Sequence, residues 1–365
     1  MRERRRALRV LMVTPRFWPA IGGVEKHVER VCEELGRMNV ESQVVTLSHS
    51  QGLRQGESRR GTVVHRLPFG SRLLAPFSLI MSGGLRAAVK SCDLVHFHDV
   101  VPLLLLYLPV RVLCPNRPFY ATFHGLEADP VPFHWRFLRR LARCLVRRCI
   151  CVGGFIATEY GIRCDTLTHG AVATSEAETE ERSGAVFVGR IEPDTRLADY
   201  VHAIHTLNRR GREMRLTVCG SGSIADHVRQ LAESLRVDAQ FMGHVERPEA
   251  AVARSQVMFA SGYMSCLEAM ALGVPVVAIA ATPLKMAYFK SLRAAGAPIS
   301  IQTSLEGVVR EVERILDNAA LQREVSQRGR RFTSTSTWTE LARTYLWLWT
   351  SPKNRPRRRS LPPVK

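Results

Sequence analysis

Short apolar runs alternate along the chain with segments in which apolar residues recur every three or four positions. Residues 8–14 form a β-branched apolar run, which predicts a buried strand, and residues 24–38 follow with helical spacing. Further strand-like runs occupy residues 41–48, 61–68, 93–98, 118–125, 149–155 and 166–170, and a helical segment covers 133–149. Apolar strands separated by helices are typical of a parallel sheet that is covered on both faces.

The same pattern restarts near residue 185. Strand-like runs at residues 185–191, 215–222, 239–244, 256–262 and 274–280 alternate with helical segments at 197–211, 224–235 and 266–273. A polar, acidic stretch without apolar periodicity, residues 173–184, separates the halves and predicts a linker. The predicted fold class is therefore α/β, with two facing Rossmann-like doubly wound domains and a cleft between them.

The predicted organisation has six parts. They are a basic tail (1–7), a first Rossmann-like domain (8–172), the linker (173–184), a second Rossmann-like domain (185–335), a C-terminal helix (336–350) and a basic tail (351–365). The last tail is rich in proline and arginine, a composition that buries little apolar surface, so we expect it to be disordered.

The chain of 365 residues has a net charge of +19, which concentrates in three segments, residues 1–9, 136–148 and 353–365. An excess of this size attracts phosphate or anionic lipid. A nucleic-acid groove would spread its charge and place aromatic residues among the basic ones, so we expect no nucleic-acid partner. The longest apolar run, residues 100–110, is too short to span a bilayer, and we expect a cytoplasmic protein.

The nine cysteines include no pair with two intervening residues, and most lie in apolar runs. We expect buried thiols in a reducing compartment, because cysteine in such runs behaves as a small apolar residue. Cys149, Cys151 and Cys164 form a group, but zinc sites usually have two spaced pairs. We therefore predict no metal site.

Two glycine loops precede predicted helices. Gly22 and Gly23 would let the backbone approach an anion at a helix N-terminus, with a plain tight turn as the alternative. Gly220 and Gly222 lie in GSGSIA, which matches a dinucleotide fingerprint. A dehydrogenase would carry this fingerprint in its first strand–turn–helix unit, with an acid after the next strand. Neither condition holds, so we expect a close-approach turn instead.

Two charged residues occupy positions suited to a ligand. Arg190 stands at the carboxyl end of a predicted strand, where a guanidinium can hold a diphosphate bidentately. An exposed loop arginine is the alternative. Glu268 lies at the start of the predicted helix 266–273, where a carboxylate is favoured by about 0.3–1 kcal/mol without any ligand. The functional alternative is that Glu268 binds both hydroxyls of a ribose.

Six segments occur in a fixed order, namely LRVLMVTPRFWPAIGGVEKHV, CDLVHFHD, YATFHG, THGAV, FVGRIEPDT and CLEAMALGVPVVA. In this combination the chain resembles the retaining nucleotide-sugar glycosyltransferases of the GT-B fold, family-four type. The resemblance implies a nucleotide-diphosphate sugar in the second domain and an acceptor in the first. It also implies that no cofactor or catalytic metal is needed and that the C-terminal helix returns to the first domain.

The resemblance assigns roles to the matching residues. Arg190 would bind the donor diphosphate and stabilise the leaving group, and Glu268 would bind the ribose. His124, in TFHG, would line the catalytic cleft, although a lone histidine is by itself more often a core residue. The predicted donor set is Gly22, Gly23, Arg190, Arg196, Gly220, Gly222, Gly262, Tyr263 and Glu268; the catalytic pair is His124 and Arg190; the acceptor side holds Glu25, Lys26, Asp99 and His124.

The chain departs from the family pattern at three positions. Thr195 stands where a second cation, a lysine, is usual, and the next residue, Arg196, is a candidate substitute. Ala260 replaces a glutamate that touches the donor sugar, and His169 replaces an asparagine. We expect an active enzyme of envelope polysaccharide or glycolipid synthesis. The alternative is a catalytically weak protein that binds nucleotide sugar or glycan as a partner subunit.

A basic amphipathic segment lies in the first predicted domain. Its apolar residues, Phe137, Leu138, Leu141 and Leu145, fall on one helical face, and the other face holds Arg136, Arg139, Arg140, Arg143 and Arg147. A basic amphipathic helix is typical of binding to an anionic membrane surface, so we predict peripheral membrane association. The alternative is a solvated basic face with its apolar side in the core.

Overall fold

The computed structural model describes residues 6–20, 22–48, 53–67, 82–125, 131–173, 182–260 and 262–352. These residues form two compact units. The first unit extends to Thr168 and resumes at Trp338, and the second unit is His169–Thr337. The predicted first domain, 8–172, continues four residues beyond this division. Most of the predicted linker and most of both predicted tails lie outside the described residues.

The first unit contains an eight-stranded sheet with the strand order β3-β4-β2-β1-β5-β6-β7-β8. Every pairing is parallel except that of β3 with β4. The short polar edge strand β3 has no apolar run to reveal it in the sequence. The strands are β1 (Leu8–Thr14), β2 (Val40–Leu47), β3 (Gly56–Arg59), β4 (Thr62–Leu67), β5 (Leu94–His98), β6 (Phe119–Phe123), β7 (Arg148–Val152) and β8 (Thr166–Thr168).

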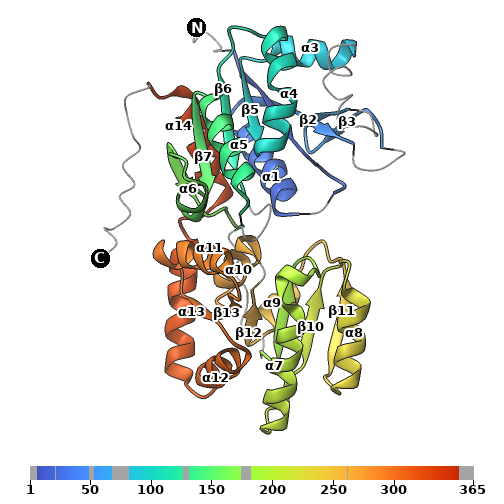
Figure 1. The fold of residues 1–365 in the computed structure, drawn as a ribbon, viewed down its shortest axis with the longest axis vertical. Helices are drawn as coiled ribbons and strands as arrows, with labels where there is room; N and C mark the ends of the chain where they lie inside the picture. Colours follow the sequence, from blue (N-terminus) through green and yellow to red (C-terminus); the bar gives the residue numbers. More distant parts are fainter. Residues whose placement is uncertain are drawn as a thin grey trace. The chain divides into compact units, whose positions relative to one another are not determined.

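Helices cover both faces of this sheet. α4 packs against α3 and α5, and α1 packs against the C-terminal helix α14 (Figure 1). The longest apolar run of the chain forms α4, and Pro109 lies within that helix. The helices are α1 (Gly23–Arg37), α3 (Gly83–Ser91), α4 (Val100–Leu113), α5 (Phe133–Cys144), α6 (Phe155–Tyr160) and α14 (Trp338–Thr350).

The second unit contains a six-stranded, wholly parallel sheet with the order β11-β10-β9-β12-β13-β14. Counted from its first strand, this is the order 3-2-1-4-5-6 of a dinucleotide-binding Rossmann sheet. The predicted α/β fold class is confirmed. The strands are β9 (Ala185–Val188), β10 (Leu216–Cys219), β11 (Ala239–Gly243), β12 (Val257–Phe259), β13 (Val276–Ile279) and β14 (Ile299–Gln302).

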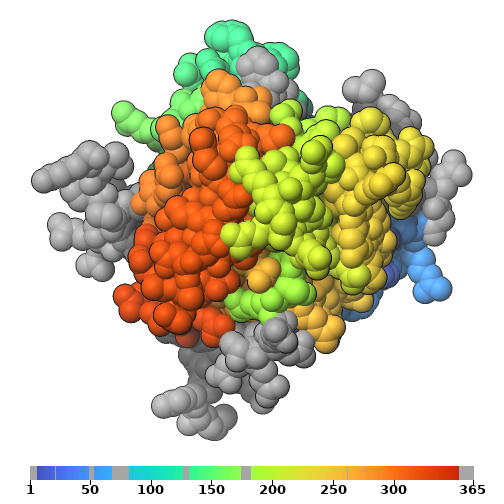
Figure 2. Space-filling view, turned by 90° about the horizontal axis from the view of Figure 1, so that it is seen from below, coloured from blue at the N-terminus to red at the C-terminus, as the bar shows by residue number. Residues whose placement is uncertain are grey.

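Apolar helix faces enclose this second sheet. α7 packs against α12 and α8, and Figure 2 shows α7 and α8 at the surface beside α12 and α13. Tyr200 of α7 stacks on Phe259 at 4.4 Å in the buried core. The helices are α7 (Leu197–Arg209), α8 (Ala225–Ser234), α9 (Glu249–Ala253), α10 (Tyr263–Ala271), α11 (Pro283–Ala294), α12 (Leu305–Leu316) and α13 (Ala319–Thr333), and Pro193–Thr195 forms one 3-10 turn.

Two predicted helix boundaries are wrong. α5 ends at Cys144 rather than 149, because Arg148–Val152 pairs with β6 as strand β7. Arg147 therefore lies outside the helix. α10 begins at Tyr263, so Glu268 is its sixth residue and not part of its first turn. A helix-terminal charge effect does not explain Glu268, since that effect falls off within the first turn.

The prediction that all nine cysteines are thiols is also wrong. Cys151 and Cys164 form a disulfide, with their Cα atoms 6.0 Å apart. Strand β7 carries Cys151, and the chain returns through Cys164 into the neighbouring strand β8. Tertiary pairing of β7 with β8 brings the two sulfurs together, and no spacing motif in the sequence announces it. None of the helices among the described residues is long and apolar enough to cross a bilayer.

Candidate active site

In open parallel sheets, ligands bind at the carboxyl ends of the strands where the strand order reverses. This switch point lies between β1 and β5 in the first unit and between β9 and β12 in the second. Asp99 directly follows β5, and Arg190 stands two residues after β9. Gly262 is in the connection that follows β12. Each unit thus has its own candidate site, called its half-site below, at the switch point of its sheet.

The first half-site begins at the N-terminus of α1. Gly22 precedes this helix in extended backbone conformation, and no side chain caps the helix there. A Cβ at Gly22 would overlap the carboxylate of Glu25, which lies against this glycine. A carboxylate is favoured beside a helix N-terminus, and the same position suits a ligand phosphate. The backbone N–H of Lys26 donates to the Gly22 carbonyl at 3.1 Å.

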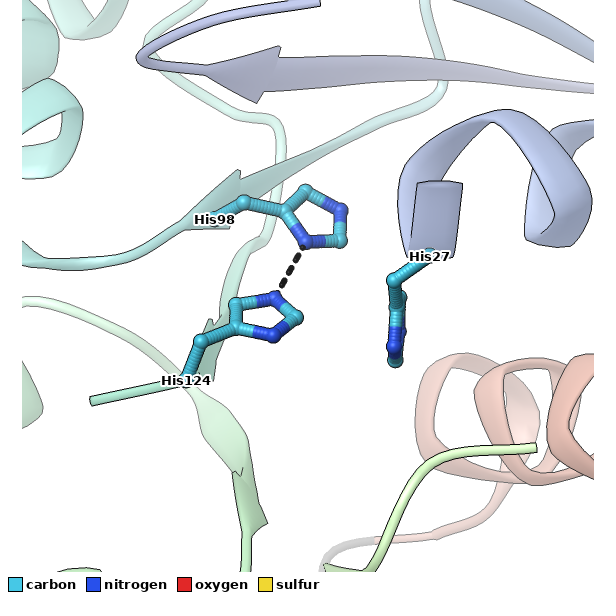
Figure 3. A group of neighbouring side chains, drawn as sticks. All are labelled: His27, His98 and His124. Carbon is cyan, nitrogen blue, oxygen red and sulfur yellow. Dashed lines mark hydrogen bonds between the residues drawn. The ribbon is translucent and has the colours of Figure 1, made fainter. Parts of the chain in front are cut away.

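Three histidines gather beside this helix (Figure 3). His98 ends β5 and His124 directly follows β6, and their Nδ1 and Nε2 atoms are 3.1 Å apart. His27 of α1 meets the ring of His124 edge-on, with the ring centroids 4.7 Å apart. Side chains alternate between the faces of a strand, so the helix α1 side of β5 receives both His96 and His98. His124 is therefore part of a cluster and not a lone histidine.

A hydrogen-bonded chain connects this cluster to the C-terminal helix. The indole Nε1 of Trp349 lies 3.0 Å from His96 Nδ1, and His96 Nε2 lies 2.8 Å from Thr122 Oγ1. Thr122 Oγ1 lies 2.8 Å from the hydroxyl of Tyr345, which lies 2.8 Å from His27 Nε2. Helix α14 is thus part of the first half-site.

The donor and acceptor chemistry of these groups fixes the direction of each hydrogen bond, from Trp349 to His27. An indole N–H can only donate, so Nδ1 of His96 accepts and the proton of a neutral His96 resides on Nε2. His96 then donates to Thr122, whose proton is left for Tyr345. Tyr345 donates in turn to Nε2 of His27, and the proton of His27 resides on Nδ1. One tryptophan therefore sets the protonation pattern of two histidines.

Burial keeps the imidazoles of the cluster neutral. It lowers the pKa of His27, His96 and His98 well below the usual value. It lowers the pKa of His124 to about 3, with a further contribution from Arg139. The Nε2 of His98 is buried and has no hydrogen-bond partner among the described residues. Whichever ring donates between His98 and His124, the outer nitrogens of the pair offer one donor and one acceptor, which suits a ligand hydroxyl.

Asp99 links this cluster to the basic helix α5. Its backbone has a left-handed φ of 73°, and its Oδ1 lies 3.2 Å from Nη2 of Arg139. The backbone N–H of His124 donates to the same oxygen at 3.4 Å. Burial raises the pKa of Asp99, and Arg139 partly offsets that rise. The Oδ1 of Asp99 therefore joins the backbone N–H of His124 to the buried guanidinium of Arg139.

The structure corrects the predicted faces of the basic helix. Arg139 is fully buried over the ring of Tyr160, and Arg143 pairs with Asp165 at 3.0 Å. Phe137 and Leu141 are exposed, although we predicted them on a common apolar face with Leu138 and Leu145. Exposed apolar side chains recur at Phe133 (80%), Phe137 (57%) and Leu141 (42%), beside exposed Arg136 and Arg140.

The second half-site contains Arg190, whose side chain is 65% exposed. Its Nη2 lies 3.5 Å from Oδ2 of Asp194. Thr195, at the position of the missing lysine, is buried and donates its hydroxyl to the Glu192 carbonyl at 2.7 Å. Arg196 pairs with Asp199 of its own helix at 2.6 Å. The role of Arg196 as a substitute cation stays a prediction.

Backbone packing explains the two glycines of the fingerprint-like loop. A Cβ at Gly220 or Gly222 would overlap the carbonyl oxygens of Gly189 and Ile191, respectively. The N–H of Gly220 also donates to the Gly243 carbonyl at 2.7 Å, so that group is not available to a phosphate. These glycines let the loops after β9 and β10 approach each other closely, and their predicted role toward a donor stays a prediction.

The remaining donor candidates lie on α10. Gly262 precedes the helix, and the backbone N–H of Tyr263 donates to the hydroxyl of Tyr288 at 2.7 Å. The Tyr263 ring is buried and stacks on Tyr288 at 4.0 Å, with His169 beside it. Glu268 is 7% exposed. Their role toward a ribose or a sugar stays a prediction.

Two groups of side chains could hold a metal ion. The ligating atoms of His27, His98 and His124 lie within 4.8 Å of one another, and neutral imidazoles are good ligands for zinc. The sulfurs of Cys149, Cys151 and Cys164 are similarly close, but two of them form the disulfide. The expectation that no catalytic metal is needed can therefore be tested at the cluster of His27, His98 and His124.

Two family models together match most of the chain. Residues 21–163 match the model described as Glycosyltransferase Family 4, and residues 173–332 match Glycosyl transferases group 1. The chain belongs to the group 1 glycosyltransferases. No curated protein matches this glycosyltransferase by sequence.

Solved structures resemble the glycosyltransferase over nearly its whole length. A sucrose-phosphate synthase from Thermosynechococcus elongatus has a TM-score of 0.75 and 14% identity, covering 94% of this chain and 98% of its own. Alr3699/HepE from Anabaena, solved with UDP and glucose, has a TM-score of 0.72 and 14% identity over 94% and 100%. The G117R mutant of TarM from S. aureus, solved with UDP, has a TM-score of 0.70 and 11% identity, covering 94% of this chain and 100% of its own. These likenesses confirm the two-domain, Rossmann-like GT-B fold.

Sequence reasoning missed most of the histidine network. His27, His96 and His98 were not selected, nor were Tyr345 and Trp349 on a helix more than two hundred residues away. The alternating pattern HFH in a predicted strand carried a usable signal, because it places two histidines on one face. The contribution of α14 had no such signal.

Proposed function

We propose that this glycosyltransferase moves a sugar from a nucleotide-diphosphate sugar to a glycan or lipid-linked acceptor, with retention of anomeric configuration. The observation that carries the proposal is Arg190, an exposed guanidinium at the switch point of a sheet with Rossmann strand order. A cation at this position suits a diphosphate, since ligands of such sheets bind there. The alternative, a weakly catalytic binding subunit, becomes an outcome of the test below.

In this proposal the second unit holds the donor. Arg190 binds the diphosphate and stabilises the negative charge on the departing nucleotide, and Glu268 binds the ribose. Gly22 and Gly23 at the start of α1 add backbone N–H groups. Preorganised dipoles and cations of this kind can replace a divalent ion, so we propose a metal-independent reaction without a cofactor.

The first unit supplies hydrogen bonds to sugar and acceptor hydroxyls. The two outer nitrogens of the neutral pair, Nε2 of His98 and Nδ1 of His124, present one donor and one acceptor. His27, oriented by Tyr345, keeps its own proton on Nδ1. A neutral imidazole can accept or donate a proton within a hydrogen bond. This property suits a retaining transfer, in which the acceptor hydroxyl attacks the sugar from the same face that the nucleotide leaves.

A lipid-linked acceptor fits the outer face of α5. Exposed Phe133, Phe137 and Leu141 form a stripe with exposed Arg136 and Arg140 beside it. The neighbouring helix α4 adds exposed Leu108 and Val112. An apolar stripe bordered by cations favours an anionic bilayer, and we propose peripheral binding to such a surface for synthesis of an envelope polysaccharide or glycolipid.

A donor screen tests the enzymatic proposal. Purified protein would be mixed with UDP-, GDP-, ADP- and TDP-sugars, and binding, donor hydrolysis and transfer would be measured with and without EDTA. Arg190→Ala should weaken binding of the preferred donor roughly 10-fold or more, since a charge-assisted hydrogen bond is lost. Arg229→Ala, which removes an exposed arginine from α8, is the matched control. Binding without any turnover would favour the weakly catalytic alternative.

Vesicle flotation tests the membrane proposal. The wild type should float with vesicles that contain phosphatidylglycerol and not with neutral ones. Replacing Arg136 and Arg140 by glutamine should weaken binding about 30-fold, at about 1 kcal/mol for each cation. The control replaces Arg314 and Arg328 of the second unit, which removes the same charge elsewhere. Equal recovery of both double variants would end this part of the proposal.

A further inference from the structure

The disulfide between Cys151 and Cys164 closes a loop that contains the whole of helix α6. This helix has only six residues, Phe155–Tyr160. A helix shorter than about 12 residues is marginal by itself in water, so the position of α6 depends on its contacts and on the chain ends that the disulfide joins. Cys151 is fully buried and Cys164 is half-buried, so a thiol in solution reaches the disulfide from the Cys164 side.

Helix α6 packs directly against the residue that follows His124. The hydroxyl of Tyr160 donates to the carbonyl of Gly125 at 3.2 Å. Gly125 has a left-handed φ of +46°, and a Cβ at this position would lie 3.4 Å from Cδ1 of Ile156. Two side chains of α6 therefore hold the backbone on the C-terminal side of His124.

The same helix supports the ion pair that contacts the backbone N–H of His124. The Cζ of Arg139 lies over the ring of Tyr160, 4.3 Å from its centroid. Arg139 pairs with Asp99, whose Oδ1 accepts from the N–H of His124. A displacement of α6 would thus disturb the backbone of His124 at both of its contacts.

The loop after α6 is otherwise held by exposed hydrogen bonds from helix α5. The Nε of Arg140 donates to the Gly161 carbonyl at 3.3 Å, and the Nε of Arg143 donates to the Arg163 carbonyl at 2.9 Å. Water can replace such exposed bonds at small net cost. Within the described part of the chain the disulfide is the single covalent cross-link, so its state decides how firmly this loop is tied.

We propose that the Cys151–Cys164 disulfide is a redox-sensitive strap that keeps His124 in place. This inference rests on the proposed function, because the strap acts on sugar transfer through His124. A dithiol reductant opens the strap by thiol–disulfide exchange. One of its thiolates attacks the sulfur of Cys164 and releases Cys151, and its second thiol then displaces Cys164. Two electrons pass to the two cysteines, each of which takes up a proton, and the reductant becomes a disulfide.

The kinetic experiment compares the oxidised protein with protein reduced by dithiothreitol, using the donor and acceptor that the wild type prefers. We expect kcat of transfer to fall about 10-fold or more on reduction, because displacement of a catalytic group is costly. Affinity for the nucleoside diphosphate should stay unchanged, and oxidised glutathione should restore kcat. Cys151→Ser combined with Cys164→Ser should have the low kcat under both conditions.

Cys149→Ser is the matched control, because it removes a buried neighbouring thiol and keeps the disulfide. This variant should respond to dithiothreitol like the wild type. Loss of the response in Cys149→Ser would overturn the assignment of the strap to Cys151 and Cys164. A titration that finds all nine cysteines as free thiols in the oxidised, denatured protein would overturn it as well.

NMR of labelled histidine tests the strap without any substrate. The ring signals of His124, assigned by their absence in His124→Gln, should shift on reduction and return on reoxidation, while those of His205 in the second unit stay unchanged. Tryptophan emission should show a Tm lower by roughly 5–10 °C after reduction. A lower Tm with unchanged His124 signals and unchanged kcat would mean a purely structural disulfide and overturn the inference. If the oxidised wild type transfers no sugar, the proposed function fails, and the His124 signals alone decide whether the strap positions this residue.

Discussion

The two units share a sheet topology and differ in the polar groups that they place at its switch point. In the first unit, buried histidines are joined to each other and to α14, and burial keeps them uncharged. In the second unit, the side chains of Arg190 and Lys285 both contact the Asp194 carboxylate, and Arg190 is 65% exposed. One fold thus presents neutral hydrogen-bonding groups in one copy and cations in the other.

The difference follows from where each group is anchored. His96 and His98 lie on a strand and His27 on α1, and all three are buried, while His124 directly follows a strand and is half-buried. The cations come from a loop after β9 and from the first turn of α11, where water reaches the arginine. A buried half-site suits hydroxyl groups that need orientation, and a partly solvated cationic half-site suits a diphosphate that must enter and leave.

Substitution of His124 is the most direct test of whether the two units have separate roles. His124→Ala should lower kcat of transfer roughly 100-fold or more, because a positioned group that moves a proton contributes at least that much. Nucleoside diphosphate affinity should stay within about threefold, since the second unit is untouched. Steady-state kinetics and calorimetry measure the two effects. His134→Ala, at an exposed position on α5, is the control, and normal kcat in the His124 variant would contradict the assignment.

A second test destabilises only the cationic unit. Gly220→Ala should lower its free energy of unfolding by about 2–3 kcal/mol, because the new Cβ overlaps the Gly189 carbonyl and the backbone φ is +159°. All five tryptophans lie in the first unit, so tryptophan emission reports that unit while circular dichroism reports both. The loss should appear in circular dichroism and not in emission.

Gly36→Ala provides the matched control for that test. This glycine lies in α1, and an added Cβ meets no atom within 4 Å. Alanine should therefore stabilise the first unit by about 0.5–1 kcal/mol. Equal effects of the two substitutions would show that close backbone approach is not what requires Gly220.

A third test uses pH. Buried histidines with a lowered pKa stay neutral in the folded state, while the unfolded chain takes up protons below about pH 6.5. Stability of the first unit is therefore complete above that pH and falls as the pH drops toward the folded value, which for His124 is about 3. Each such histidine contributes about 1.4 kcal/mol of loss per pH unit. Urea unfolding followed by tryptophan emission at pH 7 and pH 5 measures it.

The control for the pH test is His134→Gln, which removes an exposed histidine and should leave the acid sensitivity unchanged. His27→Gln removes a member of the buried cluster and should reduce the dependence on pH. If the wild type is equally stable at both pH values, the cluster is not held neutral in the way the geometry indicates.

The smallest expected effect concerns the direction of the hydrogen-bonded chain. Trp349→Phe removes the only indole donor to His96 and should cost the first unit about 1 kcal/mol. Nitrogen-15 NMR of labelled histidine should show His96 with its proton on Nε2 in the wild type and a mixture in the variant. Trp135→Phe, on α5, controls for loss of an indole. A wild-type His96 protonated on Nδ1 would contradict the derived direction.

Periodicity was enough to predict much of the fold and part of the site. Residues 8–14 became β1 without change, and β9, the first strand of the second sheet, begins at Ala185, where the predicted strand begins. Arg190 lies at the end of its strand because a short apolar run fixes where the strand stops. The same method gave a wrong prediction of the faces of the basic segment 136–148, because a helical pattern of arginines does not reveal which of them is buried.

The amino-acid sequence determined the elements, their order and the residues at the carboxyl ends of the strands, because local apolar periodicity and glycine placement act over a few residues. Only the tertiary structure decided what meets at those ends. It brought Trp349 to His96, Arg139 to Asp99 and Lys285 to the same carboxylate oxygen as Arg190. Such contacts join residues that are far apart in the chain, and the packing of whole helices on a sheet fixes them, so no local pattern can specify them.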